Sequence, residues 1–490
     1  MMGYESKENQ RKLFYYGFHL EQRVRPDHPL RKIAELIDFD FIYDEVKESY
    51  GIKGNVSVPP PVILKLMLLL ILYNVRSERE LMTTIPERLD WLWFLGYDLD
   101  DEIPDHSVLS KARSRWGVET FKHFFKRIVW QCVERGLVDG SKLFIDSSLI
   151  QADASNDSVV NRESLKRYLN QGYRELEARL QEQPTEELLE GAVNQTHIST
   201  TDPEASVVRQ GGGKAKLGYK VHRAVDEKEE IITATEVTRG QVNEAHRLPA
   251  LIEGHSLNTE KAVETVVADS KYGTVENFLH CHDRKIAVHS PDLKEQQEKS
   301  GSRAGIFNEE DFIYDAQTDT CRCPAGQRLE LRRHHTQRQA VEYVCARKVF
   351  RSCPLKDQCT HSRTGRSIKR HQRQEELSQM RAKAGSSDSK KDLPMRQHLM
   401  ERSFAQAIRY GFKRARWRNL WRVQIQEYLT ASIQNILILI RHVKEQRPVW
   451  ANRNQKVNPK KLLIRLANCF WGGFPFGYLP KPVFIYSYDL

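Results

Sequence analysis

Three acidic residues stand at positions where a charged side chain is costly unless it has a partner. Asp146 follows the apolar residues 143–145, Asp269 follows the apolar residues 266–268, and Glu401 begins an apolar-spaced helix among basic residues. A carboxylate in a buried strand must be paired with a cation or bind a metal ion. Two Mg²⁺ ions about 3.5–4 Å apart, held by carboxylate oxygens, activate a nucleophile and stabilise a leaving oxygen in phosphoryl transfer. The three carboxylates therefore predict metal-dependent phosphoryl transfer, unless each one only caps a strand or begins a turn.

The segments around the two aspartates predict the sheet that must position them. Residues 142–150 have the β-branched and apolar composition of a strand around Asp146. Residues 262–268 form a second apolar strand that ends at Asp269. The other elements predicted between residues 138 and 290 are strands at 219–225, 230–237 and 285–289 and helices at 242–253 and 275–283. This order predicts an α/β fold with a mixed sheet, in which catalytic groups commonly sit at strand ends.

Residues 1–137 are predicted to be all-helical. Apolar residues recur at three- and four-residue spacing in the segments 30–42, 61–73, 77–85 and 118–135. Asp105, His106 and Ser107 precede a further apolar and basic helix at 108–116. Several short helices ending in a basic one suit a DNA-binding domain of the helix-turn-helix kind, and a plain helical bundle with a solvated basic face is the alternative.

The remainder of the chain is predicted to hold an insertion, a cysteine-bearing segment, core helices and a tail. Residues 155–213 are polar and contain an amphipathic helix at 162–181 and a glycine stretch at 211–213, as expected for an insertion or loop. The other predicted parts are a cysteine-bearing insertion at 291–392 with a low-complexity basic linker (363–391), C-terminal core helices carrying Glu401 at 393–445, and a tail at 446–490.

Five of the eight cysteines fall between residues 321 and 359, and such clustering in a chain without secretion signals favours a metal site over disulfides. Four thiolates hold Zn²⁺ tetrahedrally in structural sites. The predicted structural zinc ligands are Cys323, Cys345, Cys353 and Cys359, with His361 as an alternative ligand. The spacing is irregular and differs from the paired CxxC of a zinc ribbon, so ordinary reduced cysteines are the alternative interpretation.

The charge and hydropathy of the chain indicate what kind of partner it has and whether it associates with a membrane. The chain of 490 residues has 76 Lys+Arg against 65 Asp+Glu, a formal charge of +11 that favours a polyanionic partner. The longest apolar run, residues 62–75, is interrupted by Lys65 and falls short of the ~20 residues that a membrane span needs. The N-terminus shows no signal-peptide pattern. We therefore expect no membrane association and a soluble protein that stays where it is made.

A strongly basic segment surrounds Glu401. Residues 396–422 hold eight Lys or Arg against that one acid, and Tyr410, Phe412, Trp417 and Trp421 interleave with them. Basic residues neutralise phosphates, and aromatic rings can stack on unpaired bases. The alternative is that the aromatic residues belong to the core while the arginines form a solvated face.

The same segment resembles the C-terminal signature of bacterial insertion-sequence transposases of the DDE type, in the branch with a cysteine-bearing insertion before the glutamate. The resemblance rests on residues 401–405, Tyr410, Gly411, 415–418, Gln424, Gln426, Leu429, Ala431, Gln434 and Asn435. Further blocks match in order at 104–107, 202–205, 218–220, 224–226, Asp269 with Tyr272 and Gly273, 323–326 and 353–355. The resemblance spans roughly residues 28 to 442, and its specificity lies in the joint order of short motifs.

The resemblance implies a ribonuclease-H-like mixed-sheet core in which Asp146, Asp269 and Glu401 bind two Mg²⁺ (or Mn²⁺) ions. It further implies metal-dependent DNA strand cleavage and strand transfer of an insertion sequence. Water and then a DNA 3′-hydroxyl would be the nucleophiles, without a covalent protein–DNA intermediate. Asp153 competes for the first position, and Asp146 is preferred because it lies within the apolar strand and has the flanking pattern of the family.

The partners implied are double-stranded DNA, as element ends and target, and a second copy of the chain in a DNA-bound homodimer or larger assembly. A cytoplasmic, nucleoid-associated protein is expected. The candidate DNA-binding residues are Arg402, Arg409, Lys413, Arg416, Arg418 and Lys220. One departure is Ile408, because the family commonly has a lysine there. The alternatives are a decayed or domesticated DNA-binding relative and a metal-dependent nuclease without strand transfer.

Overall fold

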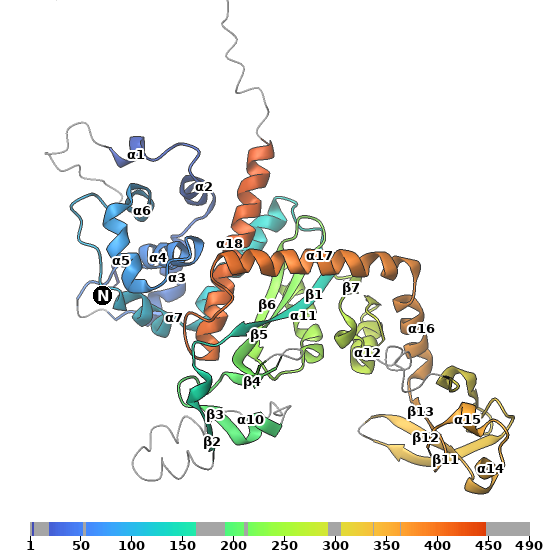
Figure 1. Cartoon of the computed structure of the whole chain (residues 1–490). Coiled ribbons are helices and arrows are strands. Elements are labelled where there is room, and N and C mark those ends of the chain that lie inside the picture. Colours follow the sequence, from blue (N-terminus) through green and yellow to red (C-terminus); the bar gives the residue numbers. More distant parts are fainter. Residues whose placement is uncertain are drawn as a thin grey trace, which may run out of the picture. The chain divides into compact units, whose positions relative to one another are not determined.

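The computed structural model describes residues 2–3, 19–51, 55–162, 192–209, 214–292, 305–336, 338–362 and 364–446. They form a mixed α/β fold (Figure 1). The predicted helix at 162–181, the glycine stretch at 211–213 and nearly all of the tail at 446–490 lie outside these residues. Among the described helices, none combines the length and the apolar character that crossing a bilayer requires.

A six-stranded mixed sheet forms the centre of the fold. β1 (Lys142–Gln151) pairs antiparallel with β5 (Lys216–Asp226) and parallel with β7 (Thr265–Val267). β5 also pairs with β6 (Ile232–Arg239) and with β4 (Ser206–Val208), while β8 (Ala287–His289) continues the parallel half beside β7. The predicted mixed sheet and its element order are thereby confirmed.

Helices cover both faces of this sheet. Leu143 and Ile145 of β1 share one core cluster with α11 (Leu248–Thr259) and α12 (Val275–Asp283). Phe144 points to the other face and joins a second cluster. That cluster includes residues of α17 (Ser387–Arg409) and α18 (Leu420–Gln446), and Figure 1 shows α17 running along this face. The alternation along β1 thus follows the period of two of a strand buried on both sides.

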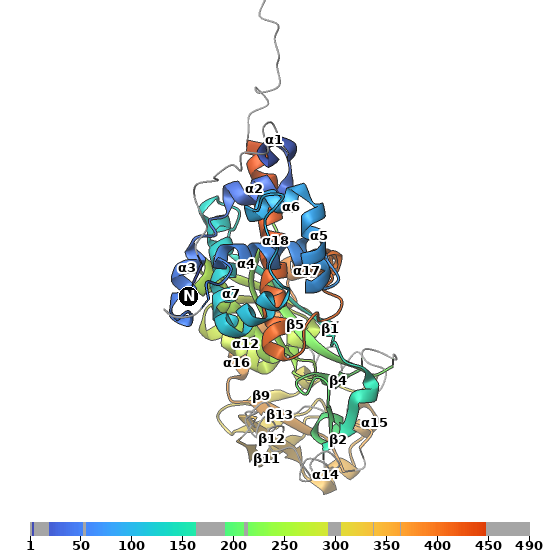
Figure 2. The same ribbon diagram turned by 90° about the vertical axis from the view of Figure 1, so that its left-hand side faces the viewer.

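The N-terminal region is helical, as predicted, and packs into the same cluster as Phe144 and α18 (Figure 2). The segment predicted as one helix at 30–42 is two helices, and two further helices, α1 and α6, were not predicted. α7 joins the two predicted segments across Gly117, whose φ of 71° is a conformation that glycine adopts readily. The helices are α1 (Leu20–Arg23), α2 (Pro29–Leu36), α3 (Phe41–Val46), α4 (Pro60–Leu72), α5 (Glu78–Thr84), α6 (Leu89–Leu95) and α7 (Ser107–Glu134).

The cysteine-bearing region contains a second, five-stranded antiparallel sheet in the order β13-β12-β11-β10-β9. The segment predicted as a low-complexity basic linker at 363–391 is largely ordered, since it contains β13, α16 and the start of α17. Its charges alternate with apolar residues that pack, such as Ile368, Leu377 and Met380. The elements are β9 (Ile313–Asp315), β10 (Thr320–Arg322), β11 (Arg328–His335), β12 (Ala340–Cys345), α14 (Arg347–Arg351), α15 (Lys356–Cys359), β13 (Ser367–His371) and α16 (Gln374–Ala384).

The described residues between β1 and β4 include the 3-10 turn η3 (Asn156–Ser158), two short strands and a short helix. β2 (Val159–Asn161) pairs with β3 (His197–Ser199), and α10 (Ala192–Thr196) leads into β3. After them Asp202 and Glu204 reach the start of α18. The Asp202 carboxylate accepts the N–H of Asn419 (3.1 Å), and Glu204 accepts that of Leu420 (2.7 Å). These side chains satisfy donors that a helix N-terminus leaves unpaired.

Candidate active site and nucleic-acid interface

Asp146 lies on β1, and Asp269 follows the end of the neighbouring parallel strand β7 at the same level. Phe144 of β1 is the register partner of Val267 of β7, and each aspartate follows two residues later. Because side chains alternate along a strand, both carboxylates belong to the face that Phe144 and Val267 share with α17. The strand register therefore brings together two of the three predicted acidic residues.

Arg396 of α17 is the cationic partner of Asp146. Its Nη1 lies 2.7 Å from Oδ2 of Asp146, and both side chains are largely shielded from solvent. Burial raises the pKa of Asp146 to about 6, although Arg396 opposes the shift and the carboxylate of Asp269 adds to it. A nearby positive charge stabilises the ionised form of a buried carboxylate, so Asp146 would bind favourably to a cation that can approach it.

Asp269 begins a short 3-10 turn, η5 (Ser270–Tyr272), and its carboxylate accepts the N–H of Lys271 at 3.0 Å. Its backbone carbonyl accepts a hydrogen bond from the Ser290 hydroxyl, which ties the turn to the end of β8. Burial raises the pKa of Asp269, and the carboxylate of Glu244 raises it further. Two neighbouring carboxylates thus share an environment that disfavours their negative charge.

Glu401, the third predicted ligand, lies on the exposed side of α17. Its Oε1 accepts a hydrogen bond from Gln397 at 3.0 Å. The oxygens of Asp146, Asp269 and Glu401 are not gathered within 4.8 Å of one another. In the described ranges, the only group of ligand-type side chains meeting that distance is His282, Asp283 and Glu376, where Arg373 pairs with both acids.

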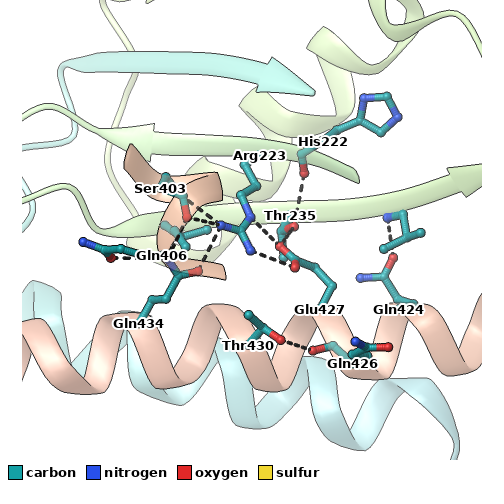
Figure 3. Close-up of polar contacts among 12 residues, drawn as sticks. His222, Arg223, Thr235, Ser403, Gln406, Gln424, Gln426, Glu427, Thr430 and Gln434 are labelled. Atoms are coloured by element: carbon teal, nitrogen blue, oxygen red, sulfur yellow. Dashed lines mark hydrogen bonds and ion pairs between the residues drawn. The ribbon is translucent and has the colours of Figure 1, made fainter. Parts of the chain in front are cut away.

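A buried ion pair fixes α17 and α18 against the sheet beside Asp146. Arg223 of β5 is the register partner of Asp146, and it binds both carboxylate oxygens of Glu427 at 2.7 and 2.8 Å. Its Nη1 also donates to Ser403 of α17 (3.1 Å to Oγ) and to Gln434 of α18 (3.0 Å), as Figure 3 shows. Arg223 and Glu427 are both 0% exposed. This network sets the position of the helix that carries Arg396 and Glu401.

A basic hollow of about 530 Å³ lies where the N-terminal helices meet the chain between α17 and α18. Arg113 is only 3% exposed, its guanidinium stacks on Trp417 (4.0 Å to the ring centre), and it pairs with Glu78 at 2.5 Å. Burial lowers the pKa values of both Arg113 and Arg416. The lining residues are Leu70, Arg76, Ser77, Glu78, Arg79, His106, Ser110, Arg113, Asp153, Arg416, Trp417, Arg418 and Arg422.

Two predicted DNA-binding residues line this basic hollow. Arg416 donates to the carbonyl of Val75 at 2.5 Å, and Arg418 donates to the carbonyl of Asp153 at 3.1 Å. The carboxylate of Asp153, the competitor for the first acidic position, pairs with Arg414 at 3.0 Å. Asp153 is therefore engaged by arginines, away from the contacts that surround Asp146.

The other predicted DNA-binding residues lie elsewhere. Lys413 lines a separate cavity of about 300 Å³ together with Lys214 and Lys216. Arg402 pairs with Glu230, and Lys220 donates to the carbonyl of Val242 at 2.8 Å. Arg409 is exposed at the end of α17. Of the interleaved aromatic residues, Phe412 is buried and Tyr410, Trp417 and Trp421 pack at the margin of the core.

The four cysteines predicted as zinc ligands line one small cavity of about 30 Å³, together with Phe350 and Arg366. Cys321 lies apart from them and is buried within the sheet. The N–H of Gln327 donates to the sulfur of Cys323 at 3.3 Å. Burial raises the pKa values of Cys345 and Cys359, and the neighbouring thiols of the cavity add to the shift. No three of these sulfurs lie within 4.8 Å of one another in the described chain.

Sequence reasoning did not identify several residues that the structure places at these sites. Glu244, Ser147 and Lys271 lie around the aspartates. Ser147 directly follows Asp146 and Lys271 lies two residues after Asp269, so their sequence positions alone could have indicated that these two residues are close to the site. Arg396 was counted only as part of a basic segment. Its spacing of one helical turn from the buried Met400 places it on the face of α17 toward the sheet. Arg76, Arg79 and Arg113 lie hundreds of residues from Arg416 in sequence, so no local signal could join them.

Two family models match the chain. Residues 18–115 match the family described as Transposase domain (DUF772), and residues 322–440 match the one described as Transposase DDE domain. The first covers helices that line the basic hollow, and the second covers β11 to β13 of the cysteine-bearing sheet, α17 and most of α18. No curated protein matches the chain.

A solved structure described as a piggyBac transposase synaptic complex with hairpin DNA is similar over 92% of this chain and 87% of that one. Its identity of 10% and TM-score of 0.29 are too low to transfer any residue role. The two family models match the two ends of the chain in separate segments, and both describe transposases. The matches of both segments to transposase domains support a DDE-type transposase.

Proposed function

We propose that this transposase cleaves DNA and transfers the cut strand at a site built on Asp146 and Asp269. The observation that carries the proposal is the register of β1 and β7, which holds both carboxylates level at the same point of the sheet. Glu401, on the helix that crosses this face, is the third proposed ligand. We further propose that the mixed sheet belongs to the ribonuclease-H-like class and that the domain boundaries predicted from the sequence apply.

Transposase DDE domains generally use divalent metal ions, and the residues at the aspartates suit one. The donors are hard carboxylate oxygens, which Mg²⁺ and Mn²⁺ prefer. The fully buried hydroxyl of Tyr272 has no hydrogen-bond partner, and the nearby carboxylates raise its pKa in addition to its burial. Asp146, Asp269 and Glu401 would hold the ions, with two as the proposed number. When bound, such ions supply charge stabilisation to a phosphoryl group under attack.

The test is Mg²⁺-dependent cleavage of double-stranded DNA carrying the sequences that flank this gene. A second substrate with a pre-cut 3′-hydroxyl end measures strand transfer separately. Cleavage without transfer would support the nuclease alternative, and binding without cleavage would support a decayed or domesticated relative. Ile408 is 50% exposed on α17, so a lysine fits there without disturbing the core, and Ile408→Lys is the variant to make in that last case.

The basic hollow is a proposed contact for the DNA backbone, and Arg402, Arg409, Lys413 and Lys220 are proposed as further contacts outside it. Arg79→Gln should weaken binding to a DNA duplex and lower the slope of log affinity against log salt by about 0.9, because one phosphate contact is lost. Fluorescence anisotropy at several salt concentrations measures both quantities. The structure records no ion pair for Arg79 within the described residues, so the loss of charge should leave folding unchanged.

Arg284→Gln is the matched control for Arg79→Gln, because Arg284 is exposed directly after α12, is not among the residues that line the hollow, and also loses one charge. A general effect of net charge would weaken binding equally in both variants. Equal salt slopes for Arg79→Gln, Arg284→Gln and the unmodified protein would contradict the assignment of the hollow to DNA.

We also propose that Cys323, Cys345, Cys353 and Cys359 hold a structural Zn²⁺ ion. Their shared cavity supports this, because four thiolates around one small space are the ligand set of a structural zinc site. Purified protein should then contain about one zinc per chain by elemental analysis, and Cys353→Ser should lose it and lower the melting temperature. Cys281→Ala removes a buried cysteine outside the cavity and should retain the zinc. Zinc-free wild-type protein would contradict the proposal.

The proposed partners are double-stranded DNA and a second copy of the chain, because two element ends must be joined. A cytoplasmic, nucleoid-associated location belongs to the same proposal. Sedimentation of the chain with and without DNA measures whether the assembly forms only on DNA.

A further inference from the structure

A third buried carboxylate, Glu244, is connected to the residues next to both aspartates. It lies in the 3-10 turn η4 (Glu244–Arg247) that joins β6 to α11, and it is 5% exposed. Its Oε2 accepts a hydrogen bond from the hydroxyl of Ser147, the residue after Asp146. Its Oε1 lies 2.5 Å from Nζ of Lys271, two residues after Asp269. Glu244 is thus held at the aspartates from a third segment of the chain.

The electrostatic coupling among these acids shows that they share one environment. Burial raises the pKa values of Asp146 and Asp269, and the charge of Glu244 contributes to both shifts. Burial would raise the pKa of Glu244 too, but hydrogen bonds from Lys271 and Ser147 outweigh it and lower that pKa. The site therefore holds three carboxylates whose negative charges must be compensated.

A buried polar atom at the same place lacks a partner. Tyr272 is 0% exposed, and its hydroxyl makes no hydrogen bond in the described structure. Besides burial, the charges of Glu244, Asp146 and Asp269 raise the pKa of Tyr272, and the hydroxyl of Ser147, next to Asp146, lowers it. Buried polar groups in folded proteins almost always have a partner. An orphaned hydroxyl among three acids points to a ligand with hydrated positive charge.

Basic side chains among the described residues pair with two of the three acids. Arg396 pairs with Asp146, and Lys271 and Lys220 lie 2.5 and 3.9 Å from Glu244. The three carboxylates are not within 4.8 Å of one another. Three ligands need not be that close in a two-ion site, because ligands about 2.1 Å from ions about 4 Å apart can lie roughly 8 Å from each other.

We propose that Glu244 is a ligand of the divalent metal site formed with Asp146 and Asp269. The inference rests on the proposed function for the existence of that site, and it adds a ligand from the turn after β6 that the acidic triad does not contain. Lys271 is then a competitor that pairs with Glu244 until a metal ion arrives.

The test is Mn²⁺ binding to the full chain without DNA, measured by isothermal titration calorimetry and by the loss of the free Mn²⁺ signal in electron paramagnetic resonance. Glu244→Gln should weaken Mn²⁺ binding by at least about tenfold, since loss of even an outer-shell partner costs ten- to hundredfold. Glu264→Gln, an exposed residue just before β7, should bind Mn²⁺ like the unmodified chain. Circular dichroism verifies that each variant is folded.

Lys271→Gln provides an independent measurement if Glu244→Gln fails to fold. Removing the competing ammonium should tighten Mn²⁺ binding by roughly threefold or more. The inference is overturned if Glu244→Gln binds Mn²⁺ like the Glu264 control, if Lys271→Gln leaves the affinity unchanged, or if the unmodified chain binds no Mn²⁺. Loss of Mn²⁺ binding in Glu244→Gln together with no DNA cleavage by the unmodified chain would sustain the inference and defeat the proposed function.

Discussion

Asp146→Asn is expected to lower Mg²⁺-dependent DNA cleavage by about a thousandfold while leaving DNA affinity within about twofold of the unmodified chain. The amide keeps the shape of the side chain but removes the negative charge that would hold a metal ion. A bound ion is worth several kcal/mol of charge stabilisation in phosphoryl transfer, and each 1.36 kcal/mol is tenfold in rate. The arginines of the basic hollow are untouched, so binding should persist. Single-turnover cleavage and fluorescence anisotropy measure the two quantities on one DNA duplex.

Asp388→Asn is the matched control, since Asp388 is exposed at the start of α17 and pairs only with Lys391 at the surface. It should cleave at the unmodified rate. Asp269→Asn and Glu401→Gln should behave like Asp146→Asn if the proposed triad is correct. Cleavage at the wild-type rate by Asp146→Asn would show that Asp146 is wrongly assigned as the first carboxylate. Cleavage at the wild-type rate by Glu401→Gln alone would show that only the third carboxylate is wrongly assigned.

Arg223→Met is expected to lower the free energy of unfolding by about 3–5 kcal/mol. Removing one partner of a fully buried ion pair leaves the other charge without compensation, and both Arg223 and Glu427 are 0% exposed. Ser403 and Gln434 would also lose their charged donor (Figure 3). Chemical denaturation followed by circular dichroism measures the change. Because the network orients α17, any folded fraction should also cleave DNA slowly.

Two further variants show whether the lost ion pair is the cause. Arg402→Met breaks an exposed ion pair between α17 and Glu230, which lies in the turn before β6, and should cost no more than about 1 kcal/mol. Arg223→Met combined with Glu427→Leu removes both charges and should recover most of the stability lost in Arg223→Met. If the double variant is as unstable as the single one, the cost arises from packing around Arg223 and not from the unpaired carboxylate.

The structure gives physical roles to motifs that the sequence showed only as a pattern. Gln424 and Asn435 of the C-terminal signature bind the backbone of β6: Gln424 accepts the N–H of Val237 at 2.6 Å, and Asn435 binds both the N–H and the carbonyl of Ile232. These side chains bind backbone N–H and C=O groups on the edge of β6 that faces away from β5, where no neighbouring strand would otherwise pair them. Asp226 accepts the N–H groups of Asp139 and Gly140 before β1.

Local patterns in the sequence were enough to determine the helical N-terminal region, the mixed sheet, the strands that carry Asp146 and Asp269, and the transposase family. Each of these depends on features within about ten to thirty residues: apolar periodicity, a strand ending in an acid, or a motif on one helix. The grouping of Cys323, Cys345, Cys353 and Cys359 was also readable in part, because all four lie in one short region.

Tertiary structure alone decided which charges meet. Glu244 reaches the aspartates because β6 returns along β5, and Arg396 reaches Asp146 because the Arg223 network holds α17 on that face. The basic hollow joins Arg79 to Arg418 across more than three hundred residues. Contacts at such separations depend on how helices and strands pack, and side-chain periodicity specifies only which face is buried, not which partner it meets. For that reason the sequence predicted the kind of chemistry, whereas the composition of the site required the fold.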